Sequence, residues 1–448
     1  MVLLQAAHRD DVVLTEDRLV VSRWQLARVV VAALIGTTFD FYDFVVSGLA
    51  AAIVWPSVFF PFSNPLTAVL LSFSVYAVGL ISRPLGNLLF AHFGDRMGRR
   101  PILIWTLLTS GLGTLAIALV PTYAEIGVSA AVLLTILRFI QAFGFGGEWG
   151  GATAWVAEFT SKSKYRGFWT GLVQLSIPLG TMMSAGIFLS LVAIQGIHGV
   201  ISGGWRIPFY IGAAVILVGI LIRLLTEESP LFASLKETKR ITKVPSLAVW
   251  KEYPRILLKT IFMFLYSGTI YFTITVFSVS YLAVLGVPPL TALTGVLIAT
   301  LGGVIAVIVG SYAGDTWGRK NMIRLSAALS LIFTVPYFLL INGRVFWIII
   351  LAMATFQVVQ QFSLGNLLVN AAEYFPTRYR YSGTGYMVTI GSAVGGLLVT
   401  VVFPFLLTIL KGPLNAWPYI AGLIVTTCVV TIALTFKVRE TKGTSLED

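Results

Sequence analysis

The sequence predicts an all-α membrane protein with twelve transmembrane helices, arranged as two pseudo-symmetric six-helix bundles. Three observations predict this fold class. The composition is too apolar for a soluble protein, twelve apolar runs are long enough to cross a bilayer, and one charged loop motif occurs twice. Together they indicate a chain that folds within a membrane as two similar halves.

The composition separates this chain from soluble proteins. Of its 448 residues, 57% are hydrophobic and 11% are charged, whereas soluble domains carry about 25% charged residues. A soluble fold of this length could not bury so much apolar surface, so we expect the surface to face membrane lipid. The net charge of +12 could suggest nucleic acid binding, but the charges fall in short loops between apolar runs. That distribution is typical of membrane topology, and we expect no nucleic acid partner.

Twelve runs meet the length of about 20 mostly apolar residues that a membrane helix needs. We place them at 28–55, 65–92, 101–121, 127–157, 167–196, 205–225, 256–284, 289–313, 321–341, 345–372, 382–410 and 415–436. The longest connection follows the sixth run. We therefore predict an N-terminal bundle at 1–225, a cytoplasmic linker at 226–255, and a C-terminal bundle with its tail at 256–448.

The basic residues predict the orientation. If the N-terminus is cytoplasmic, nearly all of the 31 Lys and Arg residues fall in loops and tails on that side. Only Arg206, Arg344 and Lys411 lie on the other side, and two more lie within spans. This bias predicts a multi-pass protein of the cell membrane with both termini in the cytoplasm. The first residues lack the pattern of a signal peptide, so we expect them to remain in the mature protein.

Two landmarks repeat along the chain. Gly94–Arg100 reads GDRMGRR, and Gly314–Lys320 reads GDTWGRK, 220 residues later. Glu158 and Glu373, each in an Ala-Glu-aromatic sequence followed by Tyr-Arg, are 215 residues apart. Two nearly equal offsets predict a parallel six-plus-six repeat with a substrate site between the halves.

Because the loop motif is repeated, we interpret it as part of a gate. The alternative interpretation is a solvated turn. Glycine permits a tight turn and close helix approach, and aspartate can accept hydrogen bonds from arginine or from a helix N-terminus. Such contacts could hold the cytoplasmic side closed in one state. The predicted gate residues are Asp95, Arg99, Glu158, Asp315, Arg319 and Glu373.

The repeated loop is similar to the signature between helices two and three of the major facilitator superfamily. Further segments narrow the resemblance: GTTFDFYDF at 36–44, RPLG at 83–86, GGEWGG at 146–151, GWRIPF at 204–209 and FPTRYRYSG at 375–383. Together they resemble the metabolite:proton symporter family over nearly the whole chain. The resemblance implies uptake of carboxylates or zwitterions together with protons, by alternating access.

The chain departs from that family in places. Many members have Glu-Trp where this chain has Asp40-Phe41, and Ala142 interrupts a stretch that is often Gln-Gly. Sugar porters carry a related Tyr-Asp in helix one and an arginine in helix four. A sugar or metabolite facilitator without proton coupling therefore remains the alternative function.

Five ionisable residues lie at membrane depth, where charge is costly and is functional by default. All are in the first half of the chain. A rise of about 1.5 Å per residue places Asp43 and Arg138 at similar depth, and likewise Arg83 and Glu148. We therefore predict an Asp43–Arg138 pair and a second Arg83–Glu148 pair, with Asp40 left near the midplane.

These charges predict proton coupling. Three carboxylates against two guanidiniums leave one surplus negative charge, which one proton would neutralise. We assign proton coupling to Asp43, Arg138 and Asp40, and expect an incoming carboxylate to compete with Asp43 for Arg138. Structural salt bridges are the alternative interpretation, and for Arg83–Glu148 packing or gating is as plausible as a functional role.

Neutral polar residues dominate the spans of the second half. Such residues often only join helices to each other, but as a set they could bind substrate. Arg138 and Gln174 of the first half complete the set. The predicted substrate-binding residues are Arg138, Gln174, Tyr266, Gln357, Gln361 and Tyr386.

Other classes of function fit less well. No nucleophile–base set or metal-ligand spacing appears, so we expect no enzyme activity, no cofactor and no metal. Cys428 is the only cysteine and reads as a buried core residue. A channel would favour oligomeric symmetry and a pore-lining ring. We expect instead a monomer whose partners are a small molecule, protons and lipid.

Overall fold

The structure of the protein, a computed structural model, describes residues 23–224 and 245–446. We call these the first half and the second half. Twelve helices or helix series in them are long and apolar enough to cross a membrane, six in each half, and the described residues contain no β-strand. The predicted fold class is confirmed. The domain division at 1–225 and 256–448 stays a prediction, and most of the predicted linker lies outside the described residues.

Six spans form the first half, and the fourth and fifth are each built from more than one helical segment. The helices are α1 (Arg23–Ile53), α2 (Trp55–Phe59), α3 (Pro65–Met97), α4 (Arg99–Ala118), α5 (Tyr123–Ile126), α6 (Ser129–Phe145), α7 (Glu148–Phe159), α8 (Arg166–Val173), α9 (Ser176–Gly199), η1 (Val200–Gly204) and α10 (Arg206–Leu224).

The second half repeats this plan, with a short helix before its first span. The helices are α12 (Pro245–Glu252), α13 (Pro254–Phe272), η2 (Thr273–Phe277), α14 (Ser278–Val284), α15 (Pro289–Trp317), α16 (Arg319–Asn342), α17 (Phe346–Gln361), α18 (Leu364–Tyr374), α19 (Thr377–Leu397), η3 (Leu398–Val402), α20 (Phe403–Ile409) and α21 (Pro413–Phe436). The segments η1, η2 and η3 are single π-helical turns.

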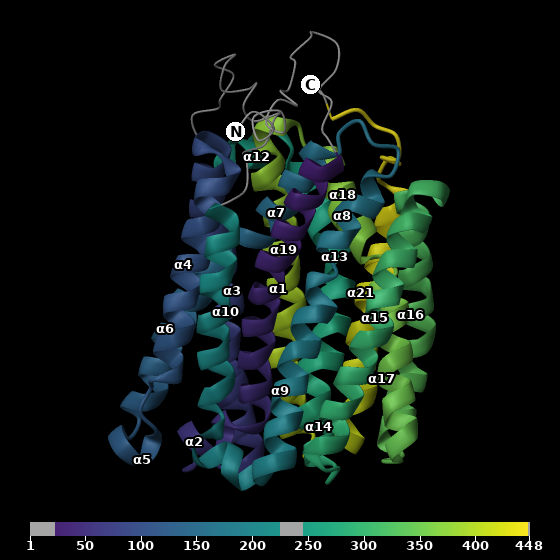
Figure 1. The fold of residues 1–448 in the computed structure, drawn as a ribbon. Helices are drawn as coiled ribbons and strands as arrows, with labels where there is room; N and C mark the ends of the chain where they lie inside the picture. The colour runs from purple at the N-terminus through teal and green to yellow at the C-terminus, as the bar shows by residue number, and fades with distance from the viewer. Residues whose placement is uncertain (1–22, 225–244, 447–448) are drawn as a thin grey trace, which may run out of the picture.

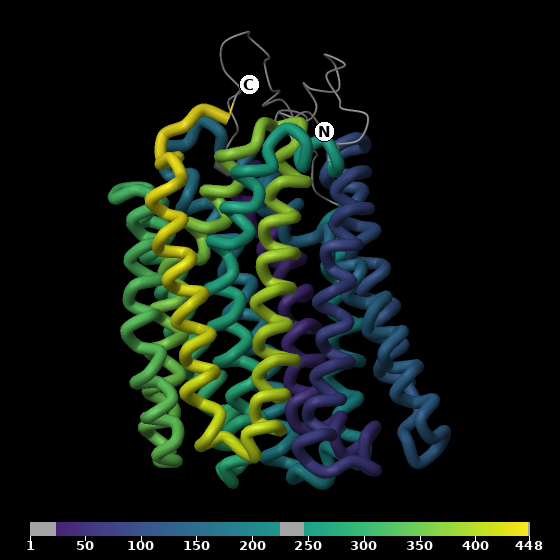
Figure 2. The backbone as a smooth tube through the Cα atoms, turned by 180° about the vertical axis from the view of Figure 1, so that it is seen from behind, coloured from purple at the N-terminus to yellow at the C-terminus, as the bar shows by residue number. Residues whose placement is uncertain are grey.

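The spans run roughly parallel, and the two halves stand side by side (Figure 1). The view from behind shows the same arrangement (Figure 2). We call the end of the bundle that carries α12 the α12 end, and the opposite end, which carries α2 and α5, the α2 end. Both the first and the last described segments lie at the α12 end, because each half crosses the bundle an even number of times.

The innermost helices line the boundary between the halves. In the apolar core of the span Pro254–Val284, 94% of the residues are buried inside the protein, whereas in that of α10 only 33% are buried. A polypeptide in lipid exposes apolar side chains and satisfies its backbone within the helix, so the outer spans expose large apolar residues such as Leu112, Ile332 and Trp347. The outer spans therefore face lipid, and the inner ones can carry polar groups.

The halves approach each other closely where α7 meets α19. A Cβ atom built on Gly150 would lie 2.3 Å from the Cα of Gly385, so neither position has room for a side chain. Small residues permit this kind of close helix crossing in membranes. The crossing lies between the α12 end and the centre of the bundle.

Candidate functional site

Buried ion pairs close the boundary between the halves at the α12 end. Arg99 pairs with Asp95 at 2.8 Å and with Glu158 at 3.1 Å. From the second half, Arg380 approaches the same Glu158 oxygen at 3.5 Å. The carboxylate of Asp95 also accepts hydrogen bonds from the backbone N–H (3.2 Å) and hydroxyl (2.5 Å) of Ser382. The first GDxxGR loop therefore holds α19 of the other half.

The second GDxxGR loop makes the reciprocal contacts. Arg319 pairs with Asp315 at 2.7 Å and with Glu373 at 3.5 Å, and Arg166 of the first half pairs with Glu373 at 3.0 Å. Asp315 accepts hydrogen bonds from the N–H groups of Gly167 (3.0 Å) and Phe168 (2.7 Å). These groups lie in the first turn of α8, where a carboxylate is favoured.

The six predicted gate residues thus lie together, three in each cluster. Sequence reasoning missed Arg166 and Arg380, which complete the clusters across the boundary. The signal was present, because both arginines belong to the repeated Tyr-Arg sequence after each glutamate. A gating role for the eight residues stays a prediction.

The chain end adds contacts that no sequence pattern indicated. The carboxylate of Glu440 accepts hydrogen bonds from the N–H groups of Arg319 (3.0 Å) and Lys320 (3.1 Å) at the start of α16. Farther along, the carbonyl of Thr444 accepts from Arg166 at 3.0 Å and that of Leu446 accepts from Arg380 at 3.2 Å. The last described residues therefore touch one gate arginine from each half.

At membrane depth, the predicted direct pair of Asp43 and Arg138 is wrong. Gln141 lies between them: it accepts a hydrogen bond from Arg138 and donates one to Asp43 at 2.5 Å. The reason is helical spacing, because Gln141 follows Arg138 by three residues and so shares its face of α6. Arg138 also donates to the hydroxyl of Ser47 at 3.2 Å. The two charged groups therefore contact each other only through the neutral amide of Gln141.

The predicted Arg83–Glu148 pair is also wrong. Glu148 pairs with Arg223 of α10, whose guanidinium donates to both carboxylate oxygens, one of them at 2.6 Å. Room for Arg223 comes from Gly36, since a Cβ atom there would lie 2.1 Å from the guanidinium. Arg223 lies at the end of the sixth predicted run, next to the linker, so the sequence analysis counted it among the loop charges.

Arg223 also corrects the predicted charge count. Three buried carboxylates, of Asp40, Asp43 and Glu148, now face three buried guanidiniums. The cluster has no surplus negative charge, and Glu148–Arg223 neutralises itself. Two acids, Asp40 and Asp43, and two arginines, Arg83 and Arg138, remain. None of these four forms a direct ion pair among the described residues.

A small cavity lies at the centre, between the halves. Its volume is about 20 Å³, which is room for about one water molecule. It is lined by Phe41, Arg83, Trp149, Ile177, Phe264, Ser267, Gly268, Tyr271, Phe272, Gln360, Gln361, Leu364 and Ser392. We call it the central cavity.

The predicted substrate residues lie partly around this cavity. Gln361 lines it, and Gln357, one turn away on α17, is buried with neither side-chain polar atom hydrogen-bonded among the described residues. Neither Gln357 nor any of the other four predicted residues lines it. Gln174 accepts from Trp149 at 2.8 Å, and Tyr386 packs on Trp250 of α12 with ring centroids 5.5 Å apart.

The last two of the six are held inside their own halves. Tyr266 bonds the hydroxyls of Ser326 and Ser363, and Arg138 bonds Gln141 and Ser47. Sequence reasoning assigned Arg83 to an ion pair instead of this cavity and missed Gln360 and other lining residues, because the sequence does not show which face of each helix meets the other half.

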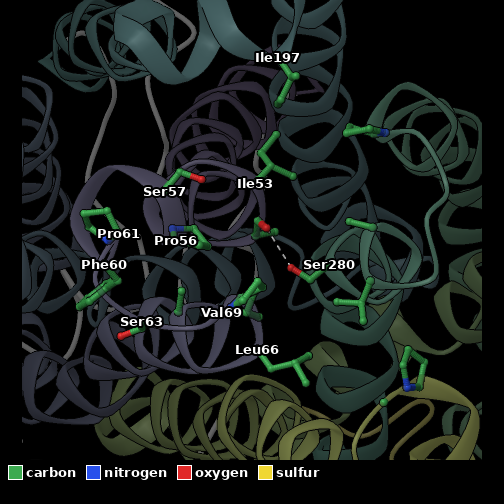
Figure 3. A pocket seen from close by; sticks show the side chains of 18 of the residues that line it. Ile53, Pro56, Ser57, Phe60, Pro61, Ser63, Leu66, Val69, Ile197 and Ser280 are labelled. Atoms are coloured by element: carbon green, nitrogen blue, oxygen red, sulfur yellow. Dashed lines mark hydrogen bonds between the residues drawn. The ribbon is translucent and has the colours of Figure 1, made fainter.

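A wide vestibule of about 850 Å³ opens at the α2 end. Figure 3 shows its wall, in which Pro56, Phe60 and Leu66 of the first half face Ser280 of the second. Ser280 donates a hydrogen bond of 3.0 Å to the carbonyl of Ala52, and this contact joins the two halves in the wall of the vestibule. The conformation is therefore closed by ion pairs at the α12 end and open to a vestibule at the α2 end.

Comparisons with known proteins agree with this architecture. The sequence pattern of the Major Facilitator Superfamily matches residues 33–400. The inner membrane metabolite transport protein YhjE of Escherichia coli is 32% identical, over 85% of this chain and 88% of its own. The shikimate transporter of Escherichia coli is 29% identical, over 90% and 92% of the two chains.

Two further similarities concern another transporter and the fold. The proline/betaine transporter of Escherichia coli is 29% identical, over 86% of this chain and 78% of its own. A solved structure of the proton:xylose symporter XylE superposes with a TM-score of 0.74, at 16% identity, over 94% of this chain and 98% of that one. At that identity the likeness concerns the fold alone.

Proposed function

The chain belongs to the Major Facilitator Superfamily and is a multi-pass membrane transporter of metabolites rather than an enzyme, and we propose that it carries a small organic acid or zwitterion together with protons. The curated relatives support the substrate class, since they include transporters of shikimate and of proline or betaine. The chemistry of the buried acids supports the coupling.

One observation carries the proposal: two buried carboxylates lack a cation in contact. Asp43 is fully buried and Asp40 is 3% exposed, and each has one oxygen without a hydrogen-bond partner among the described residues. An isolated buried carboxylate is costly when ionised, and binding a proton removes that cost. Asp40 and Asp43 are therefore the proposed proton sites.

Arg138 takes a supporting role in this proposal. It lies near Asp43 but contacts it only through Gln141, so it can partly compensate Asp43 whenever that carboxylate is ionised. Because Arg138 does not line the central cavity, we do not assign it direct contact with the substrate. Protonation of Asp43 would free Gln141 and Arg138 to rearrange, which could be sensed at the boundary between the halves.

The difference between the two ends of the bundle supports transport by alternating access. The ion pairs at the α12 end would break when that end opens, and the vestibule at the α2 end would close. The basic residues concentrate in the loops of the α12 end, so we propose that this end is cytoplasmic. The vestibule would then admit substrate and proton from outside.

The test is the pH of a lightly buffered medium around proteoliposomes that contain the purified protein. Shikimate, proline, glycine betaine and D-xylose would be added in turn. Symport predicts alkalinisation of the medium with one of the first three. Uptake of labelled substrate without any pH change would contradict proton coupling, and would favour a facilitator of the same metabolites.

A further inference from the structure

We propose that Arg83 is the residue that anchors the carboxylate of the transported molecule. The inference rests on the proposed function, in that it takes the substrate to be an organic acid or a zwitterion. It goes further by naming the cation, which the predicted depths had paired with Glu148. The geometry of the central cavity and the idle donors of Arg83 carry the argument.

Arg83 has the position that an anchor needs. It lies in α3 of the first half, and it is the one charged residue among those that line the central cavity. The cavity must widen beyond its present volume of about 20 Å³ to admit a substrate, and because both halves line it, a molecule held there would touch each of them. Substrate sites of transporters with this repeat lie at such an interface near the middle of the membrane.

The hydrogen-bond donors of Arg83 are unused. Its guanidinium makes no hydrogen bond or ion pair with any described residue, and its Nε is buried without a partner. A buried arginine without acceptors is expensive. The two other arginines at this depth differ, because Arg138 donates to Gln141 and Ser47 and Arg223 donates to Glu148.

Aromatic rings hold the Arg83 guanidinium in place. Its central carbon lies 3.8 Å from the ring centroid of Phe44 and 5.6 Å from that of Phe145. Stacking on a ring face engages the π face of the guanidinium and leaves its N–H edge free. That edge matches a carboxylate, which can accept two parallel hydrogen bonds from it.

The opposite wall offers neutral groups for the rest of the molecule. Gln360 donates to the hydroxyl of Ser267 at 2.6 Å, which leaves its carbonyl oxygen without a partner, and Gln361 has both polar atoms unpartnered among the described residues. Amide oxygens accept from hydroxyl or ammonium groups. The rings of Trp149 and Tyr271, also in the lining, suit a quaternary ammonium. A hydroxy acid or a zwitterion with one carboxylate fits this set.

The test compares matched compounds that differ only in the carboxylate. Binding to the detergent-purified protein would be measured calorimetrically at one pH and without a membrane gradient. The pairs are glycine betaine and choline, proline and prolinamide, and shikimate and its methyl ester, with D-xylose as a neutral sugar. We expect wild-type protein to prefer the carboxylate member of at least one pair by tenfold or more.

The Arg83→Gln variant should lose that preference, with affinity for the carboxylate lowered at least tenfold. Arg83→Lys keeps the charge but not the planar edge, and should lose affinity at least threefold while it retains the preference. Arg206→Gln is the control, because Arg206 lies at the α2 end and bonds only backbone carbonyls in the described structure. It should bind like wild type.

Two results would overturn the assignment. One is wild-type affinity and preference in both Arg83 variants, which would make Arg83 a packing residue. The other is binding of D-xylose, or of the pair member that lacks the carboxylate, as tightly as the acid. Because this assay contains no proton gradient, a failure of proton coupling in proteoliposomes would leave the anchor standing. The two proposals can therefore fail separately.

Discussion

The two halves carry the same gate residues at the α12 end and differ in their charged residues at membrane depth. At the α12 end each half contributes an Asp-Arg pair, a glutamate and a reciprocal arginine, and each aspartate reaches across to a helix of the other half. At membrane depth the symmetry ends. By the same offset of 220 residues Gly303 stands where the first half has Arg83, and by the offset of 215 Ser363 stands in the place of Glu148.

This difference indicates that the two tasks have different requirements. We call the cluster of Asp95, Arg99, Glu158 and Arg380 the first latch, and the cluster of Asp315, Arg319, Glu373 and Arg166 the second latch. Closing an end requires both halves equally, because each latch holds a helix of the opposite half. Binding a proton and a charged substrate requires only one set of ionisable groups, and burying a second set would cost free energy without any gain. The second half therefore offers amides and hydroxyls. The following predictions test this division, starting with the largest expected effect.

The Arg223→Met variant should be the most damaging. It removes the partner of Glu148 and leaves a buried charge uncompensated, which typically costs about 3–5 kcal/mol. We expect loss of folded protein on size-exclusion chromatography and a much lower melting temperature. The double variant Arg223→Met/Glu148→Gln removes both charges and should recover most of the folded fraction. A single variant as stable as wild type would contradict the account of this pair.

Breaking either latch should have equal effects. Arg99→Ala and Arg319→Ala each remove two ion pairs with buried carboxylates. Contacts to charged groups are worth about 1.5–3 kcal/mol each, so the α12 end should open at least tenfold more often. The measurement is the alkylation rate of Ser392→Cys, a residue of the central cavity, in a Cys428→Ser background.

Each of the two variants, Arg99→Ala and Arg319→Ala, serves as the control for the other. Rates that rise in both variants, and agree within about threefold, would support reciprocal gating. An increase in one variant and none in the other would show that the latches are not equivalent, despite their repeated sequence.

Substitutions in the second half should affect recognition but not coupling. Gln360→Ala removes an amide from the wall of the central cavity, and a neutral hydrogen bond is worth about 0.5–1.5 kcal/mol. We expect KM to rise about threefold to tenfold, while the number of protons carried per substrate is unchanged. A changed proton ratio, measured from substrate flux and medium pH together, would place coupling in both halves.

Removal of the chain end should have the smallest effect. A stop after Gly443 deletes the carbonyls that accept from Arg166 and Arg380, but both arginines keep their glutamates. We expect the alkylation rate of Ser392→Cys to rise less than tenfold. A rise as large as that of Arg99→Ala would make the chain end an equal part of the latch.

The fold could be predicted because its signals are local or repeated. Twelve apolar runs follow from the bilayer thickness, and the latch residues lie in motifs whose spacing recurs. The buried pairs were predicted wrongly because depth along a helix does not give the direction in which a side chain points. Gln141 is neutral and Arg223 ends a span, so neither stood out, yet they decide how Asp43 and Glu148 are paired.

The residues that line the central cavity could not be predicted from the sequence, for a similar reason. Arg83 and Gln360 line it only because α3 and α17 turn particular faces toward the other half. Gln361 and Tyr266 were both predicted to bind substrate because they are polar residues in spans. Gln361 lines the cavity, whereas Tyr266 bonds within its own half. Polarity in a membrane helix selects candidates, and the packing of the halves decides among them.

The most direct test of the central claim, that Asp43 of the first half couples substrate to protons, compares accumulation with exchange in Asp43→Asn. Labelled glycine betaine, proline or shikimate, whichever the wild type takes up, would be followed in proteoliposomes. An inward proton gradient would drive accumulation in one set, and unlabelled substrate inside would drive exchange in the other. The account predicts that the variant loses gradient-driven accumulation and keeps exchange. Accumulation at the wild-type level in Asp43→Asn would contradict it.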